Sequence, residues 1–275
     1  MKQQLIIGMP GSGKSTYIAA LRHVLLADDV QTELGFVGLA DEERHLNDLE
    51  ADWLRCKEVQ RTKPATEGWV QFRVRDRRTG AEATISVPDL RGELFEQPAC
   101  FDQCQKDLYD GVAAADGIVL FTNADREDDA LMISDLGDLL GDDGLEEAEP
   151  INPFRPQDMP EEVKIVEFLQ MANRRPLPCR RRRVAVLVSA WDVVKNGISP
   201  ETWLASNRPM LAQFLKYNPE LWDVRIYGVS AQGGRLPRDR ARLAKIKNPS
   251  ERINLVGHGA APHDLTAPLQ WLGSF

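Results

Sequence analysis

A glycine-rich turn close to the start of the chain limits what this sequence can fold into. Residues 5–16 read LIIGMPGSGKST, so an apolar run leads into glycines and then into Lys-Ser-Thr. Residues 8–15 match the pattern G-x-x-x-x-G-K-[ST] at every fixed position. Such a turn needs a buried strand before it and a helix after it, because its backbone N–H groups then surround a phosphate at the helix start. The pattern therefore predicts an α/β fold with a nucleotide site at one edge of a sheet.

The composition agrees with one large globular domain. The chain has 275 residues, of which 43% are hydrophobic and 28% are charged, enough to bury a substantial core. We expect a single domain over residues 1–275, with residues 122–183 as an insertion. No apolar run is long enough to span a bilayer and no secretory signal precedes the first strand, so we expect a cytoplasmic protein without a membrane span. The net charge of −8 argues against general nucleic-acid binding.

Short apolar segments alternate with longer stretches of helical spacing along the chain, which is typical of a parallel sheet covered by helices. Six segments are predicted as strands, at residues 4–7, 70–74, 83–87, 117–121, 184–188 and 224–229. The second and third flank the charged turn RDRRTG, so we expect them to form an antiparallel hairpin. The sequence thus predicts a three-layer P-loop NTPase fold, with a mostly parallel six-stranded sheet that contains one antiparallel hairpin strand.

The residues of the glycine-rich turn are expected to hold the phosphate chain of the nucleotide. Lys14 is placed to reach the β- and γ-phosphate oxygens, and the Ser15 hydroxyl to bind Mg²⁺. The predicted phosphate-binding residues are Gly8, Gly11, Ser12, Gly13, Lys14, Ser15 and Thr16. This turn alone does not distinguish a GTPase from an ATPase or a small-molecule kinase.

A second motif follows the third predicted strand. The stretch ISVPDLRGELF contains Asp89 and Gly92 in the pattern D-x-x-G. In a switch-type GTPase the aspartate holds Mg²⁺ through a water molecule and the glycine N–H bonds the γ-phosphate, so the next segment senses that phosphate. D-x-x-G is a short pattern, but its place at the end of a hairpin strand favours the switch interpretation.

Two later loops carry residues that suit a guanine base. The stretch VLVSAWDVV places Asp192 where a guanine-reading [NT]-K-x-D loop has its aspartate, with Ser189 in the Asn or Thr position and Ala190 in place of the lysine. A carboxylate there accepts hydrogen bonds from N1–H and the 2-amino group, which adenine does not offer. After the sixth predicted strand, Ser230 and Ala231 resemble a short S-A-x loop whose backbone contacts O6.

The four motifs together resemble those of a P-loop GTPase of the Ras-like translation-factor class, over nearly the whole chain. The stretches GMPGSGKSTYIAAL, PDLRGELF and LTAPLQWL further resemble the double-GTPase families of bacterial conflict systems. The resemblance implies GTP and GDP as ligands, Mg²⁺ as cofactor, slow hydrolysis and a switch coupled to a partner protein such as a second GTPase.

The residues for hydrolysis are less well defined by the sequence. A first-switch threonine that binds Mg²⁺ and the γ-phosphate is expected at Thr62 or Thr66, and Thr62 is preferred because it follows an extended segment. Glu93 stands beside Gly92, where the Ras-like pattern has a water-orienting glutamine. A carboxylate there could orient water or repel the γ-phosphate. The predicted catalytic residues are Lys14, Thr62 and Glu93.

Two other functions remain open at this point. A small-molecule kinase would use the same turn on ATP, with the arginine-rich stretch RRPLPCRRRR at residues 174–183 as its lid. That alternative leaves Asp89, Asp192 and Ser230 unexplained together. A non-catalytic nucleotide-binding scaffold would account for the departures at Ala190 and Glu93.

Overall fold

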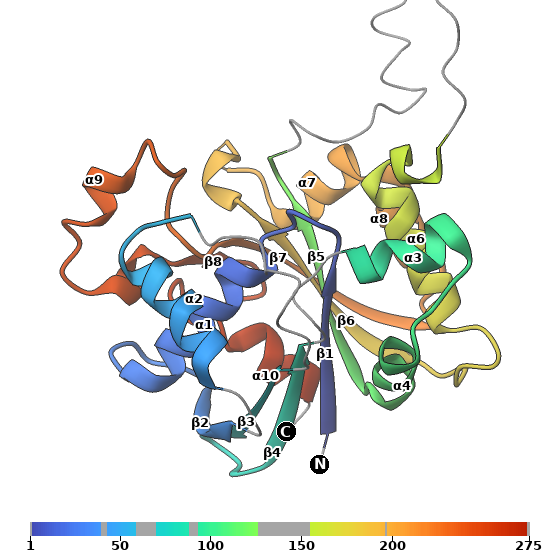
Figure 1. Ribbon diagram of the computed structural model, residues 1–275, viewed down its shortest axis with the longest axis horizontal. Coiled ribbons are helices and arrows are strands. Elements are labelled where there is room, and N and C mark those ends of the chain that lie inside the picture. Colours follow the sequence, from blue (N-terminus) through green and yellow to red (C-terminus); the bar gives the residue numbers. More distant parts are fainter. Residues whose placement is uncertain are drawn as a thin grey trace, which may run out of the picture.

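The computed structural model describes residues 2–39, 43–58, 70–87, 93–125, 155–195 and 197–273. In this part of the chain an eight-stranded sheet in the order β2-β3-β4-β1-β5-β6-β7-β8 forms the centre, with helices on both faces (Figure 1). The predicted three-layer α/β architecture is therefore confirmed. The figure also shows that residues near the two ends of the described chain, in β1 and α10 (Ala267–Gly273), lie close together.

The six predicted strands are all present, but the predicted strand count is wrong. The strands are β1 (Lys2–Gly8), β2 (Leu34–Leu39), β3 (Val70–Asp76), β4 (Glu82–Val87), β5 (Gly117–Asn123), β6 (Arg182–Ser189), β7 (Trp222–Ser230) and β8 (Asn254–Val256). The two that the sequence analysis missed, β2 and β8, are the edge strands. β2 contains two glycines and an irregular register between Phe36 and Gly38, and β8 has only three residues. Neither has a continuous apolar run like those by which β1, β5 and β6 were recognised.

The pairing of the strands places six carboxyl ends at one edge of the sheet. β1 runs parallel to β4 and β5, and β5, β6 and β7 follow in parallel. β3 is antiparallel to β4, as the hairpin prediction requires, and also to β2, while β8 is antiparallel to β7. The glycine-rich turn and the loops after β5, β6 and β7 therefore lie at the same edge, where ligands of open α/β sheets bind.

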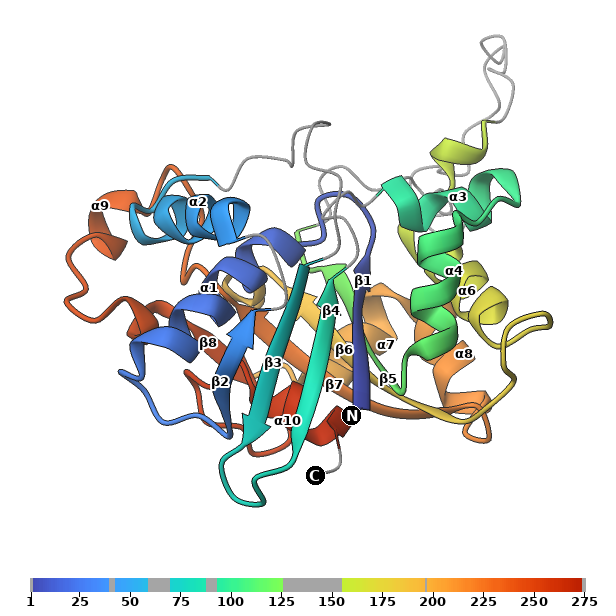
Figure 2. The same cartoon turned by 60° about the horizontal axis from the view of Figure 1, so that its bottom comes forward.

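Helices cover the two faces of the sheet over separate apolar cores. On one face, α1 (Lys14–Ala27), α2 (Glu43–Leu54) and α10 pack on the sheet. The opposite face is covered by α3 (Glu93–Phe101), α4 (Lys106–Ala114), α6 (Glu161–Ala172), α7 (Pro200–Asn207) and α8 (Pro209–Tyr217), as Figure 2 shows. β1 is buried on both sides, with Ile6 in the first core and Leu5 and Ile7 in the second. This is why its sequence is continuously apolar.

The predicted insertion, residues 122–183, overlaps the last two residues of β5 and the first two of β6, and includes the short 3-10 helix η1 (Pro156–Asp158) as well as α6. Ile165, Phe168 and Leu169 of α6 are fully buried in the second core. The latter part of the predicted insertion thus takes part in the packing of the domain, whereas residues 126–154 lie outside the described residues. The boundaries of the insertion stay a prediction. Within the described part of the chain, no helix has the length and apolar character needed to cross a membrane.

Candidate functional site

The predicted phosphate-binding turn lies between a strand and a helix, in the expected place. Gly8 ends β1, and Gly13 directly precedes α1. Gly11 and Gly13 have positive φ angles of 73° and 86°, a region that favours glycine. At Gly8 a Cβ atom would lie 2.6 Å from Ser12 Oγ and 2.8 Å from Phe121 Cβ, so close packing excludes a side chain. The glycines of the pattern are therefore explained by backbone geometry and packing.

Lys14 is folded back into the turn from which it begins α1. Its Nζ atom donates hydrogen bonds to the carbonyl oxygens of Gly8 and Met9, at 2.6 and 2.8 Å, and to Ser12 Oγ at 3.2 Å. The side chain is buried, and Nζ lies 5.6 Å from the centre of the Phe95 ring of α3. A phosphate that enters the turn would compete with these carbonyls for the ammonium group.

A pocket of about 170 Å³ opens beside the turn, between the loops that follow β5, β6 and β7. Six of its lining residues were predicted from the sequence: Gly13, Thr16, Ser189, Asp192, Ser230 and Ala231. Gln232, the third residue of the predicted S-A-x loop, also lines the pocket, and lining residues that the sequence analysis missed include Asn123, Asp125 and Arg235. The signal for them was available, because each follows the carboxyl end of a parallel strand within a few residues. Residues of the glycine-rich turn and of the two loops predicted to contact the base thus line one cavity.

The two loops predicted to read a base are joined by a direct hydrogen bond. Ser230 Oγ donates to Asp192 Oδ1 at 2.5 Å and accepts from the Gly233 N–H at 3.2 Å. The carbonyl of Ala231 accepts a bond of 2.9 Å from the indole Nε1 of Trp53, which comes from α2. Each loop is therefore held by bonds to other parts of the chain, with the Asp192 carboxylate exposed at the pocket.

Further contacts join the turn to the pocket. Asn123 at the end of β5 donates from Nδ2 to the carbonyl of Gly11 at 3.1 Å. Gly13 packs so closely on the β6 loop that an added Cβ would lie 2.8 Å from Ser189 Cβ. On the far side, Arg235 forms an ion pair of 3.2 Å with Asp125. The turn and the pocket therefore form one continuous site.

Several predicted residues cannot be placed. Thr62, Thr66, Asp89 and Gly92 lie outside the described residues, and Glu93 is placed only as the first residue of α3. Of the predicted Mg²⁺ ligands, the structure describes Ser15 alone, in the first turn of α1. The described residues contain no group of three His, Cys, Asp or Glu side chains that could hold a metal ion.

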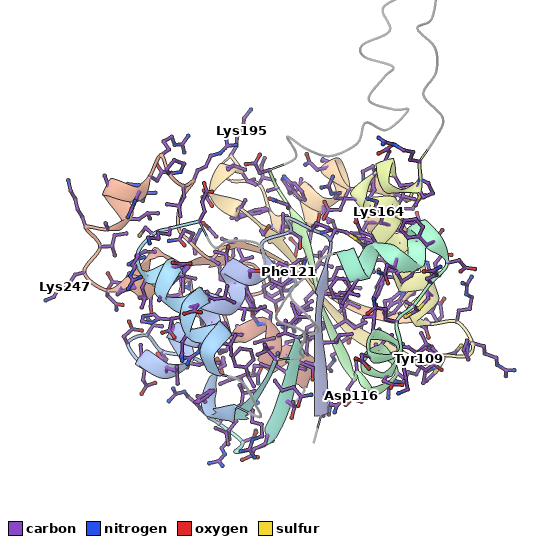
Figure 3. The ribbon with its side chains drawn as sticks, in the orientation of Figure 1. Tyr109, Asp116, Phe121, Lys164, Lys195 and Lys247 are labelled. Carbon is purple, nitrogen blue, oxygen red and sulfur yellow. The ribbon has the colours of Figure 1, made fainter. Side chains whose placement is uncertain are left out.

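Helix α3, which follows the D-x-x-G motif, is docked against α6. Phe95 packs edge to face on Phe168 with 5.8 Å between ring centres. Glu96 Oε1 forms an ion pair of 2.7 Å with Nζ of the buried Lys164, which Figure 3 labels beside α3 and α6. The start of α3 therefore contacts Lys14 through Phe95 on one side and α6 on the other.

The arginine-rich stretch 174–183 lies at the opposite edge of the sheet, before β6. Arg180 forms an ion pair of 3.5 Å with Asp116, which Figure 3 labels near the lower end of the sheet, below Phe121. Arg182 is buried and donates to the carbonyls of Ala115 and Ala172, and this burial lowers its pKa to about 10. These arginines hold the amino ends of the strands together. The stretch is therefore not in the position of a kinase lid, and that part of the kinase alternative is wrong.

Comparison with known proteins agrees with the motifs. A family model described as Double-GTPase 1 matches residues 5–272. No curated protein matches the chain significantly. One solved structure that the chain resembles is bacterial selenocysteine-specific elongation factor EF-Sec, with 11% sequence identity and a TM-score of 0.40. That match covers 88% of this chain and 28% of the other, so the chain spans little more than a quarter of that structure.

Proposed function

This chain belongs to the Double-GTPase 1 family, and on that premise we propose that it binds GTP and GDP in the pocket and hydrolyses GTP to GDP and phosphate. The observation that carries this proposal is the meeting of Asp192 and Ser230 in one cavity beside the phosphate-binding turn. A pocket for a purine base and a turn for its phosphates are thus adjacent. Family membership supports guanine as the base.

Recognition of guanine rests on the Asp192 carboxylate. Asp192 accepts hydrogen bonds from N1–H and the 2-amino group, while the Ala231 backbone N–H donates to O6. The bond from Ser230 holds the carboxylate at the pocket before the base arrives. The Ala190 position lacks the usual lysine, but the loop is still held, because Trp191 packs where a Cβ on Gly228 would lie only 2.2 Å away.

The phosphates are bound by the turn. Backbone N–H groups of residues 11–16 face the β- and γ-phosphates, and Lys14 exchanges its bonds with the Gly8 and Met9 carbonyls for phosphate oxygens. Ser15, Thr62 and Asp89 supply hydroxyl and carboxylate oxygens, which are the ligands that Mg²⁺ prefers, so this donor set fits the ion. When bound, Mg²⁺ would offset the negative charge that develops on the β- and γ-phosphate oxygens.

Hydrolysis is an in-line attack of water on the γ-phosphorus, in which the bond from phosphorus to the β-phosphate oxygen breaks and GDP leaves. Thr62 and Glu93 position the water, and the Gly92 N–H bonds the γ-phosphate. Loss of that phosphate releases the segment before α3. We place this switch in a bacterial multi-gene conflict system, where a partner protein, such as a second GTPase, responds to it.

The test is competition binding of GTP, ATP and XTP by the purified chain and by Asp192→Asn, together with chromatography of the products. The wild type is expected to prefer GTP and to release GDP and phosphate. In Asp192→Asn an amide N–H faces the guanine donors, so GTP affinity falls about a hundredfold and XTP gains, since two bonds to a charged acceptor are each worth about 1.5 to 3 kcal/mol.

Asp223→Asn is the matched control, because Asp223 is half-exposed at the opposite edge of the sheet and pairs with Arg183 at 3.4 Å. It should leave all three affinities unchanged. If the wild type prefers ATP, or if Asp192→Asn does not change the preference among the three nucleotides, the result contradicts the GTPase proposal and supports the kinase alternative. If the protein binds GTP tightly but forms no product, the result supports the non-catalytic scaffold.

A further inference from the structure

The side chain of Gln232 is buried at the base pocket with no hydrogen-bond partner. It is only 9% exposed and lines the pocket directly after Ala231. Neither Nε2 nor Oε1 finds a partner among the residues that the structure describes. A buried carboxamide without partners costs free energy, and such groups are rare enough in proteins that each calls for an explanation.

A second unpartnered group lies in the same pocket. The Ser189 hydroxyl is also buried, and its oxygen has no partner among the described residues. By contrast, Ser230, on the same loop as Gln232, has both of its bonds satisfied inside the protein. Among the described residues that line this pocket, the buried side-chain polar atoms without a partner are therefore those of Ser189 and Gln232, while Ser230 is satisfied by the protein. A ligand in the pocket is the missing partner that both can share.

The chemistry of the amide selects one edge of the bound base. Guanine presents N7 and O6 on one edge, and both atoms only accept hydrogen bonds. The Ala231 N–H is assigned to O6 under the proposed function, and Gln232 is the next residue along the chain, so N7 is the nearest acceptor that is left. Ser189 has a short hydroxyl in a position where a carboxamide is common, which leaves room for an amide from the other loop.

We propose that Gln232 is a base-binding residue of the pocket, whose Nε2 donates a hydrogen bond to N7 of guanine. Because both amide atoms are shielded from solvent, the side chain makes this contact after a rotation about its own torsions when the base enters. This inference rests on the proposed function and deepens it.

The experiment compares GTP with 7-deaza-GTP, in which a C–H group replaces N7 and only that acceptor is lost. The wild type is expected to bind GTP about fivefold more tightly than 7-deaza-GTP, the effect of one hydrogen bond. Gln232→Leu, which keeps a side chain of similar size without the donor, should bind both equally. Gln232→Glu places a carboxylate against N7, so it should weaken GTP by more than tenfold and 7-deaza-GTP by less.

The ratio of the two affinities is the decisive readout, because a variant that merely destabilises the protein lowers both affinities together. Gln4→Leu is the control, since Gln4 is also buried with an unpartnered Oε1 but donates to Leu269 of α10. It should retain the wild-type ratio. A Gln232→Leu ratio equal to that of the wild type would overturn the inference.

Failure of the proposed function has a different signature. If the wild type binds GTP and Asp192→Asn shifts it toward XTP, the proposed function stands whatever Gln232 does. If the wild type prefers ATP, both are overturned, because each is stated for guanine. N7 is an acceptor in adenine as well, so the Asp192 experiment is the one that distinguishes the two bases. The two variants of Gln232 together keep the test valid if one of them does not fold.

Discussion

The base side and the phosphate side of the site differ in how their polar groups are held. The base side is formed by residues 189–193 and 230–235, and its loops are joined to each other and to α2 by the bonds of Ser230 and Trp53. The phosphate side is formed by residues 8–15. There the strongest donor, Lys14, is bonded to carbonyls of its own turn.

This difference predicts how each side contributes to affinity. On the base side Asp192 is already positioned, so binding a base breaks few existing bonds. Nearly all of the free energy of the new contacts therefore contributes to affinity. On the phosphate side Lys14 must first leave two carbonyls, so only the surplus of phosphate bonds over carbonyl bonds appears as affinity. The charge of the phosphates supplies that surplus, because an ammonium group is attracted to a charged phosphate oxygen more strongly than to a neutral carbonyl oxygen.

The largest expected effect is that of Lys14→Ala, which removes the ammonium group from the phosphate side only. The surplus attraction of the ammonium group for the charged phosphates is lost, so GTP affinity should fall by about 4 kcal/mol, or about a thousandfold. Affinity for guanosine, which lacks phosphates, should stay within about twofold. Titrations with a fluorescent GTP analogue and with guanosine measure the two sides separately. An unchanged GTP affinity would disprove the role of the turn, and a parallel loss of guanosine binding would disprove the separation of the two sides.

Gly13→Ala tests the point where the two sides touch. The substitution puts a side chain at φ 86° and a Cβ 2.8 Å from Ser189 Cβ, so it should lower the free energy of unfolding by about 3 kcal/mol. Gly11→Ala is the matched control, because Gly11 also has a positive φ but no atom within 4 Å of the added Cβ. It should cost only about 1 kcal/mol of backbone strain. Chemical denaturation of both variants gives the difference, and equal losses would show that Ser189 does not restrict the turn.

Ser230→Ala tests whether the base side is held in advance. Without its hydroxyl, Asp192 loses an internal donor and the Gly233 N–H an acceptor. GTP affinity should therefore fall about fivefold, or about 1 kcal/mol. Ser250→Ala removes a similar bond of 2.6 Å between a buried serine and Asp29, away from the pocket. That control should lower stability by a similar amount and leave GTP affinity unchanged. Calorimetry of both variants distinguishes positioning from a general loss of stability.

The same contrast explains what the sequence could reveal. Inner strands such as β1 and β6 were predictable because strands buried on both faces are continuously apolar, whereas β3 alternates buried and exposed residues. The turn at residues 8–15 was predictable because its geometry demands glycine at fixed spacing. Ser189, Asp192, Ser230 and Ala231 could be predicted to lie in one pocket, because the carboxyl ends of parallel strands share one edge.

The remaining features depend on contacts between distant residues. Nothing local indicates that Lys14 bonds to Gly8 and Met9, or that Trp53 reaches Ala231. The buried state of Gln232 follows from the packing of its loop, and the role of Arg182 from four carbonyls that the fold brings together. From sequence alone a charged side chain is predicted to lie at the surface, and only the tertiary structure shows when it is buried.

The smallest expected effect concerns α3, where the phosphate side meets the rest of the protein. Phe95 lies near the Lys14 ammonium, and Glu96 pairs with Lys164 of α6. If the γ-phosphate draws Lys14 away from its carbonyls and bonds the Gly92 N–H, the backbone of residues 93–101 should open less often. We expect amide hydrogen exchange there to be about twofold to fivefold slower with a non-hydrolysable GTP analogue than with GDP, a change of about 0.4 to 1 kcal/mol in opening free energy.

Residues 209–217 in α8 are the internal reference for this measurement, because they pack on α6 and α7 and do not line the pocket. Their exchange should be the same with both nucleotides. Equal protection of α3 in the two states would remove the switch from the proposed function and leave nucleotide binding intact. Slower exchange in residues 189–193 and 230–235 as well would break the comparison between the two sides, since a base side that is held in advance has no reason to respond to the γ-phosphate.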